Sequence, residues 1–245
     1  MSSIRERLAA LGMHGLADEL DDLVAHAAKR RNAPLALVER MLDIEERERA
    51  RRSLERRSKR SRVGTFRPMS EFNWTWPKSL PRAKVESALA LDFMREEKNL
   101  ILIGAHGLGK TMIAKNVVHQ AVQHGHSALF ITASALLLDL GGQESARALD
   151  RRLRHYARVG CLCIDELGYL SYDQAGADLF FQLVNRRYEK KPTIITTNKR
   201  FAEWGSVFPG AACTTALIDR LVHHAEVIGI QGKSYRLREA QLDGA

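Results

Sequence analysis

The segment that most constrains the fold is Gly-Ala-His-Gly-Leu-Gly-Lys-Thr, which fits the pattern G-x-x-x-x-G-K-T with Gly104, Gly109, Lys110 and Thr111 at the defined positions. An apolar run, residues 100–103, comes immediately before it, and a helical pattern of apolar residues follows. Glycines let such a loop turn its N–H groups toward phosphate, and the next helix directs its positive end there. The sequence therefore predicts a nucleotide site between a strand and a helix.

Each residue of this loop has an expected role. Lys110 is expected to reach the terminal phosphates, and the Thr111 hydroxyl is expected to bind magnesium. The residues predicted to contact the nucleotide are Gly104, Ala105, His106, Gly107, Leu108, Gly109, Lys110, Thr111 and Met112.

A second apolar run, residues 161–164, ends in adjacent acidic residues, Asp165 and Glu166. Successive side chains of a strand point to opposite faces, so the two carboxylates are expected to have separate tasks. We expect Asp165 to hold magnesium and Glu166 to polarise the water that attacks the γ-phosphate.

A third apolar run, residues 193–197, ends in the polar residue Asn198, which is expected to hydrogen-bond both the γ-phosphate and the attacking water. This segment also disfavours a guanine-specific site. Guanine recognition requires N-K-x-D, whereas the fourth position here is Phe201.

The order of these runs predicts an α/β fold with a parallel sheet. Residues 100–103, 128–131, 161–164 and 193–197 are strand candidates separated by helical patterns. The amino-terminal region is expected to be helical, with a break near Gly12 and Gly15 and a second helix from Pro34 to Arg62. An aromatic, proline-containing connector follows. The expected domains are a helical domain at 1–66 and an ATPase domain at 67–245.

Residues 47–62 hold nine Lys or Arg and two Glu, and account for most of the net charge of +9. At three- and four-residue spacing the arginines form one stripe along a helix. The alternative is a solvated helix with the i,i+4 pairs Glu45–Arg49, Glu48–Arg52 and Glu55–Lys59. Because the bases outnumber the acids, contact with the DNA backbone is favoured. The predicted DNA-binding residues are Arg49, Arg52, Arg56, Arg57, Lys59 and Arg60.

Other features of the sequence lead to further predictions. Trp74 and Trp76 are expected to anchor the domain by packing, with a wall of the adenine pocket as the alternative. The neighbouring histidines His223 and His224 lack acidic or cysteine ligands at usual metal-site spacing. The three cysteines fit no disulfide framework and no apolar stretch is long enough to span a membrane, so the expected location is the cytoplasm. Two interpretations stay open for five further bases, a second basic surface on the ATPase core or ordinary exposed charge: Arg151, Arg152, Arg154, Lys199 and Arg200.

Together these motifs resemble the IstB-like ATP-binding proteins, the transposition helper ATPases of insertion sequences. This family belongs to the AAA+ P-loop ATPases and is related to replication initiators and helicase loaders. The resemblance covers almost the whole chain. It rests on Leu-Gly-Met from residue 11, Phe-Asn-Trp-Thr-Trp-Pro from 72, GAHGLGKT from 104, LCIDELGYL from 162, TTN from 196 and ALIDRLVHH from 216.

The resemblance implies further structural expectations. The strand before Asn198 should lie between those before Lys110 and Asp165. Arg220 should act as an arginine finger on the ATP of a neighbouring subunit. Because the sequence ends ten residues after Tyr235, no C-terminal lid domain is expected. Arg236 or Arg238 is the candidate to replace the arginine that such a lid would carry.

The resemblance also implies a function: Mg-dependent ATP hydrolysis by a homo-oligomer that assembles with ATP on duplex DNA. This assembly would assist the transposase encoded by the same element in selecting and delivering target DNA. The alternative is a DnaC-like replicative helicase loader that binds single-stranded DNA. A small-molecule P-loop kinase is disfavoured because the sequence offers no substrate-binding lid.

Overall fold

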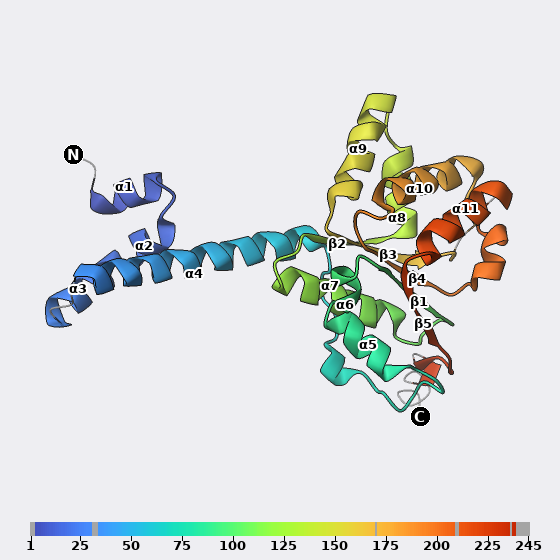
Figure 1. The fold of residues 1–245 in the computed structure, drawn as a ribbon, viewed down its shortest axis with the longest axis horizontal. Helices are drawn as coiled ribbons and strands as arrows, with labels where there is room; N and C mark the ends of the chain where they lie inside the picture. Colours follow the sequence, from blue (N-terminus) through green and yellow to red (C-terminus); the bar gives the residue numbers. More distant parts are fainter. Residues whose placement is uncertain (1–2, 31–33, 170, 209–210, 236, 239–245) are drawn as a thin grey trace. The chain divides into compact units, whose positions relative to one another are not determined.

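The computed structural model describes residues 3–30, 34–169, 171–208, 211–235 and 237–238. The chain divides into two compact units, Met1–Arg56 and Arg57–Ala245 (Figure 1). The division falls within helix α4 (Pro34–Ser61) rather than between residues 66 and 67. The last turn of α4 belongs to the second unit, where Arg57 Nε donates a hydrogen bond to the Val122 carbonyl at 3.2 Å.

The first unit contains α1 (Ile4–Ala10), α2 (His14–Asp18), α3 (Leu20–Arg30) and most of α4. The predicted break lies at Gly12, which turns the chain with φ of 76°. Gly15 is instead part of α2 and allows close helix packing, because a Cβ there would lie 2.5 Å from Glu48 Cβ on α4. The expected helical amino-terminal region is confirmed.

A small apolar core and one buried carboxylate hold the first unit together. Leu16, Leu23 and Ile44 form the buried core. Glu45 is 5% exposed and accepts hydrogen bonds from the backbone N–H groups of Gly15, at 3.1 Å, and Leu16, at 3.4 Å. Burial alone would raise the pKa of Glu45, but hydrogen bonds from Arg49 and these two N–H groups outweigh it and lower the pKa.

The second unit is built on a parallel five-stranded sheet with the order β2-β3-β4-β1-β5. The strand before Asn198 therefore lies between those before the phosphate loop and Asp165, as the resemblance implied. The four predicted strands are confirmed, and β5 was missed because its burial is only partial. The strands are β1 (Asn99–Gly104), β2 (Ala128–Thr132), β3 (Cys161–Leu167), β4 (Thr193–Thr197) and β5 (Ala225–Ile230).

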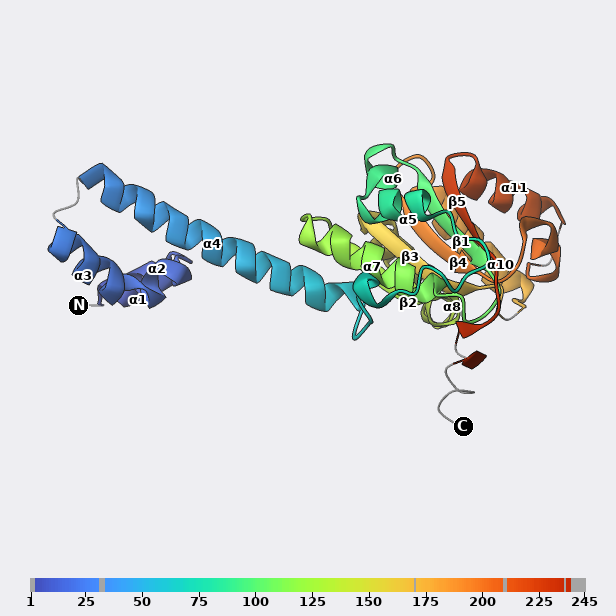
Figure 2. The same ribbon diagram turned by 90° about the horizontal axis from the view of Figure 1, so that it is seen from below.

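Helices cover both faces of this sheet, as Figures 1 and 2 show. The short helices η1 (Met69–Glu71) and η2 (Phe201–Ser206) lie in connections. One face carries α5 (Arg82–Leu89), α6 (Asp92–Arg95) and α7 (Lys110–Gln123). The other carries α8 (Ala133–Gly141), α9 (Ala146–Arg158), α10 (Gln174–Arg187) and α11 (Ala211–Val222). No helix in the described part of the chain is long and apolar enough to span a bilayer.

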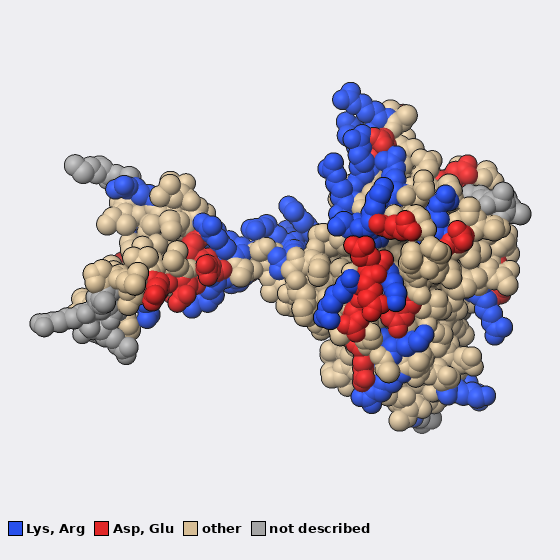
Figure 3. All heavy atoms as spheres, viewed as in Figure 1, with Lys and Arg blue, Asp and Glu red and all other residues tan. Residues whose placement is uncertain are grey.

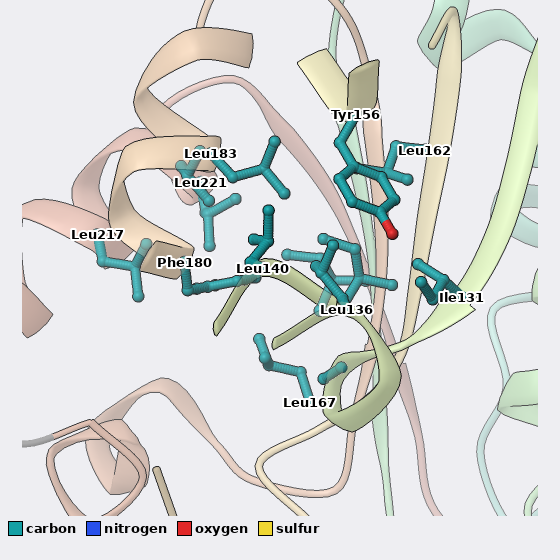
Figure 4. Close-up of a cluster of buried hydrophobic side chains, with 14 of the residues drawn as sticks. Ile131, Leu136, Leu140, Tyr156, Leu162, Leu167, Phe180, Leu183, Leu217 and Leu221 are labelled. Carbon is teal, nitrogen blue, oxygen red and sulfur yellow. The ribbon is translucent and has the colours of Figure 1, made fainter. Parts of the chain in front are cut away.

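The larger core lies between the sheet and α8 to α11. Leu136 and Leu140 of α8 gather there with Phe180 of α10 and with Leu217 and Leu221 of α11 (Figure 4). All five side chains are 0% or 1% exposed. Because burial of each such side chain contributes about 1.5–3 kcal/mol, this face holds the strands rigidly enough to fix the loops at their ends.

A buried arginine connects the helices of this face to β4. Arg187, the last residue of α10, donates hydrogen bonds to the carbonyls of Tyr156, at 2.8 Å, and Pro192, at 2.5 Å, and to the Thr193 hydroxyl at 2.9 Å. Burial lowers its pKa to about 10, which leaves the side chain charged at neutral pH. This network fixes the beginning of β4, the strand that ends next to Asn198.

Candidate nucleotide-binding site

The phosphate loop joins β1 to α7, and its backbone requires glycine. Gly107 and Gly109 have φ of 72° and 88°, in the left-handed region that disfavours other residues. A Cβ at Gly109 would lie 2.6 Å from Phe72 Cε2, and one at Gly107 would overlap the Ser234 hydroxyl. The sequence spacing thus matches a tightly enclosed loop at the carboxyl end of β1.

Lys110 is the first residue of α7, and its side chain folds back along the loop. Its Nζ donates hydrogen bonds to the carbonyls of Gly104, at 2.7 Å, and Ala105, at 2.8 Å. This arrangement holds a positive charge beside loop N–H groups at a helix amino terminus, where anions are stabilised.

Asp165 is buried and surrounded by hydroxyl groups. Thr111 Oγ1 lies 3.1 Å from both of its carboxylate oxygens, and Thr196 Oγ1 donates to Oδ1 at 2.5 Å. The side chain is 3% exposed. Hydroxyl and carboxylate oxygens are the ligands that magnesium prefers, so Thr111 and Asp165 fit the ion that the sequence predicts.

Glu166 has a different environment because β3 is irregular at this point. The pairing of β3 with β4 shifts between Ile164 and Leu167, and Glu166 has φ of 61°. Its N–H donates to Thr196 Oγ1 at 3.0 Å, while its side chain is exposed. The two carboxylates are separated as predicted, but a strand bulge contributes to the separation in addition to simple alternation.

Asn198 follows β4 and reaches the phosphate loop. Its amide nitrogen lies 2.9 Å from His106 Nε2. The ring of His106 also contacts Tyr169, with centroids 5.8 Å apart. Residues from the ends of β1, β3 and β4 therefore meet at one edge of the sheet, where parallel α/β folds bind ligands.

These residues line a cavity of about 310 Å³. Loop residues 106–112, Glu166 and Asn198 contribute to its wall, whereas Gly104 and Ala105 do not. Sequence reasoning missed several other lining residues: Arg67, Glu71, Phe72, Asn73, Pro77, Tyr169, Thr196, Thr197 and Tyr235. The aromatic connector was the available signal for some of them, but nothing in the pattern marked Tyr235.

The two tryptophans of the connector differ in position. Trp76 lines the cavity, which favours for this residue the alternative that it forms a wall of the nucleotide pocket. Its Nε1 donates to the Lys233 carbonyl at 2.8 Å, and the Arg238 guanidinium lies 4.5 Å from the ring centroid. Trp74 instead contacts Phe72, with centroids 5.0 Å apart, and lies outside the cavity wall. Arg236 lies outside the described residues.

Arg220 does not contribute to the cavity of its own chain. It lies near the end of α11, shortly before the point at which β5 begins. The phosphate loop instead follows the carboxyl end of β1, the strand that pairs in parallel with β5. Its guanidinium lies 4.8 Å from the centroid of Phe181. Within the described part of the chain, its Nη1 atom is buried and has no hydrogen-bond partner.

The arginines of α4 fall into two groups. Arg49 Nε lies 2.9 Å from Glu45 Oε1, and Arg52 Nε lies 2.6 Å from Glu48 Oε1, as the alternative interpretation predicted. Hydrogen bonds from Arg51 and Arg52 lower the pKa of Glu48 to about 2.

The third predicted pair is replaced, because Glu55 binds Arg51 at 2.5 Å rather than Lys59. Arg56, Lys59 and Arg60 are exposed, and none of them has an acidic partner among the residues that the structure describes. Arg57, which belongs to the second unit, is half-buried and donates to the Val122 carbonyl of the same unit. The open basic surface of α4 is therefore shorter than the predicted stripe.

A second concentration of positive charge covers α9 (Figure 3). Arg152 is half-buried and paired with Asp139, and Arg154 is paired with Asp150. Four arginines of this helix are exposed: Arg147, Arg151, Arg154 and Arg158. Lys199 and Arg200 come from the connection after β4, so the five residues considered in the sequence come from two separate elements.

Comparison with known proteins identifies the family. The family model of the IstB-like ATP binding proteins matches residues 6–242. The chain belongs to this family. A relative from insertion sequence IS21 of Pseudomonas aeruginosa is 34% identical over 244 residues, which cover 100% of this chain and 92% of the relative. A relative from insertion sequence IS5376 of Geobacillus stearothermophilus is 32% identical and covers 98% of this chain and 95% of the relative. Both names refer to ATP binding.

Solved structures support the fold of this IstB-like chain. The crystal structure of DnaI has a TM-score of 0.58 at 18% identity, and the match covers 67% of this chain and 90% of that one. A DNA replication initiation factor has a TM-score of 0.52 at 18% identity, covering 66% of this chain and 49% of the other. At such low identity these matches show the fold alone, which is the predicted AAA+ core.

Proposed function

We propose that this IstB-like protein hydrolyses ATP with magnesium and uses the nucleotide to control its assembly on duplex DNA. The observation that carries the proposal is the convergence of Lys110, Asp165, Glu166 and Asn198 at one edge of the sheet, with three of them at a single cavity. Each residue type matches one requirement of phosphoryl transfer to water.

The roles follow from the contacts. The loop N–H groups and Lys110 bind the β- and γ-phosphates, for which Lys110 exchanges its two carbonyl contacts. Thr111 and Asp165 would hold magnesium, which would supply positive charge next to the phosphates. The exposed Glu166 carboxylate orients a water and accepts its proton as the water attacks the γ-phosphate. Asn198 holds the γ-phosphate from the side of His106.

A substitution in the cavity wall tests the catalytic assignment. Glu166→Gln should bind ATP as the unmodified protein does and hydrolyse it about 10²–10⁴-fold more slowly, because the general base is lost. Glu71→Gln is the matched control, since Glu71 also lines the cavity but has no catalytic task in this proposal. Phosphate release under saturating ATP measures both, and normal turnover by Glu166→Gln would refute the assignment.

We further propose that α4 contacts the DNA backbone through its open basic surface, Arg56, Lys59 and Arg60. Three exposed bases on adjacent turns suit a row of phosphates, and contacts of this kind bind DNA with little sequence preference. The relatives' names refer to insertion sequences, which supports an element-encoded transposase as the partner. The protein would present target DNA to that enzyme, and ATP hydrolysis would release or remodel the complex.

The DNA proposal is tested with Glu166→Gln protein and labelled DNA in ATP, in ADP and without nucleotide. Tight, salt-sensitive and ATP-dependent binding to duplex DNA is the expected result, together with an increase in sedimentation coefficient. A preference for single-stranded DNA would favour the helicase-loader function instead. A monomer in saturating ATP and duplex DNA would overturn the proposed assembly.

A further inference from the structure

We propose that Glu189, His223 and His224 form a binding site for a divalent transition-metal cation, with zinc the best match. One ligand atom from each residue lies within 4.8 Å of the other two. Glu189 Oε1 is 3.4 Å from His224 Nε2. All three side chains are exposed, so a cation can enter from solvent without opening the fold.

The fold creates this cluster from distant segments. His223 and His224 connect α11 to β5, whereas Glu189 follows α10. Sequence spacing therefore gave no metal pattern around the two histidines. Hydrogen bonds hold the backbone of both histidines. The His223 N–H donates to the Asp219 carbonyl at 2.9 Å, and the His224 carbonyl accepts from the Asn99 N–H at 2.6 Å.

The distances suit a small tetrahedral ion. Zinc–nitrogen bonds of 2.0–2.1 Å place tetrahedral ligand atoms about 3.4 Å apart. The Glu189–His224 separation already has this value, and movement of the exposed Glu189 and His224 side chains toward His223 can shorten the remaining distances. Two imidazoles and one carboxylate leave a fourth position for water, as in zinc sites with three protein ligands.

Tyr188 supplies an orienting contact of the kind that accompanies metal-binding histidines. Its hydroxyl lies 3.2 Å from His223 Nδ1. This contact leaves Nε2 of the same ring for a cation and restricts the ring orientation. Tyr188 is itself positioned by a hydrogen bond from its N–H to the Val184 carbonyl at 2.9 Å. The cluster thus has a partner beyond its three ligands.

This site is separate from the proposed ATP site in place and in chemistry. It lies where β1 and β5 begin, since Asn99 pairs with Ala225, whereas the phosphate loop follows the end of β1. Its two nitrogen ligands favour zinc and other first-row transition ions, whereas the oxygens of Thr111 and Asp165 favour magnesium. A bound cation would join the ends of α10 and α11, one turn beyond Arg220.

Zinc binding is measured on the full-length chain, without an affinity tag and without nucleotide, by calorimetry and thermal unfolding. We expect one zinc per chain from this site. At a hundredfold excess over Kd, the unfolding temperature should rise by about 5–10 °C. Magnesium at the same concentration should produce no such shift through this site. Absence of zinc binding would overturn the proposal.

Variants locate the site. His224→Ala and Glu189→Gln should each weaken zinc binding about tenfold or more, and Tyr188→Phe should weaken it about tenfold. His126→Ala is the control. His126 is exposed and lies two residues after His124, far along the chain from the proposed ligands, so its loss should leave zinc affinity unchanged.

Cobalt absorption reports the geometry in the same proteins. A tetrahedral spectrum is expected in the unmodified chain and should be absent in both ligand variants. Binding of an ATP analogue by every variant verifies that each has folded. Unchanged zinc affinity in His224→Ala and Glu189→Gln would refute the site, whatever the activity of the proposed ATPase.

Discussion

The ATP cavity and the basic helix α4 present their functional side chains in different ways. At the nucleotide site, Asp165 and Asn198 are held by contacts from other strands or loops, with Thr196 on Asp165 and His106 beside Asn198. On α4 the neighbours are one turn away on the same helix, and they decide which arginines are available. A short motif therefore specifies the cavity, whereas a charge count alone does not specify the surface.

The largest effect should follow removal of the lysine from the phosphate loop. Lys110→Ala should abolish ATP binding, because it removes the positive charge that lies at the phosphate loop beside the carbonyls of Gly104 and Ala105. Lys115→Ala is the control on the same helix, since Lys115 contacts Thr65 and lies outside the cavity wall. Nucleotide binding is measured by fluorescence of a labelled ATP analogue. Binding by Lys110→Ala near the normal level would contradict the assignment of Lys110 to the phosphates.

Substitution of Arg220 tests whether the residues of one chain are enough for ATP hydrolysis. Arg220→Ala should bind ATP but hydrolyse it about 10³-fold more slowly, as expected for loss of an arginine finger.

Mixing the Lys110→Ala and Arg220→Ala variants tests directly whether Arg220 acts on the ATP of a neighbouring subunit. Lys110→Ala subunits still carry Arg220, and Arg220→Ala subunits still carry an intact cavity. A mixture should therefore recover part of the ATPase activity that each variant lacks alone. Normal turnover by Arg220→Ala would return this residue to a packing role against Phe181.

The two groups of bases on α4 should differ in their effect on DNA binding. Alanine substitution of Arg56, Lys59 and Arg60 together should reduce the slope of log affinity against log salt by about 3, one unit for each phosphate contact. Substitution of Arg49, Arg51 and Arg52 should reduce it by less than about 1, because these side chains already bind glutamates. Equal effects would mean that the ion pairs exchange freely for phosphate.

The smallest effect concerns the fold of the first unit at acidic pH. The pKa of Glu45 is lowered below the ordinary value of 4.5, so its stabilising contribution is present above that pH and is lost as the pH falls through the folded-state pKa. Glu45→Ala should cost about 1–3 kcal/mol of unfolding free energy at neutral pH and remove this pH dependence. Glu46→Ala, at an exposed position, should do neither. Helical circular dichroism against urea and pH measures both variants.

The sequence predicted those parts of the molecule that depend on local pattern. Apolar runs and glycine spacing mark the phosphate loop, Asp165, Glu166 and four strands, so these features could be predicted. The strand order came from the family resemblance, since periodicity does not specify which strands become neighbours.

Other features depend on contacts between distant segments. The bulge at Glu166 is a feature of the pairing between β3 and β4. Trp76 is positioned by a hydrogen bond from its Nε1 to the carbonyl of Lys233. Strand β5 lacks a fully buried apolar run. The cluster of Glu189 with His223 and His224 likewise exists only after α10 and α11 have packed. Such features could not be predicted from spacing along one chain.

The contact between the phosphate loop and the segment after β5 gives the molecule a built-in reporter. The Tyr235 N–H donates to the Gly107 carbonyl at 2.9 Å, so this amide exchanges its hydrogen with solvent only when the two segments separate. Nucleotide that orders the loop should slow that exchange, even though the amide lies more than a hundred residues along the chain from Gly107. Hydrogen–deuterium exchange at Tyr235 would therefore record the state of the loop without a label.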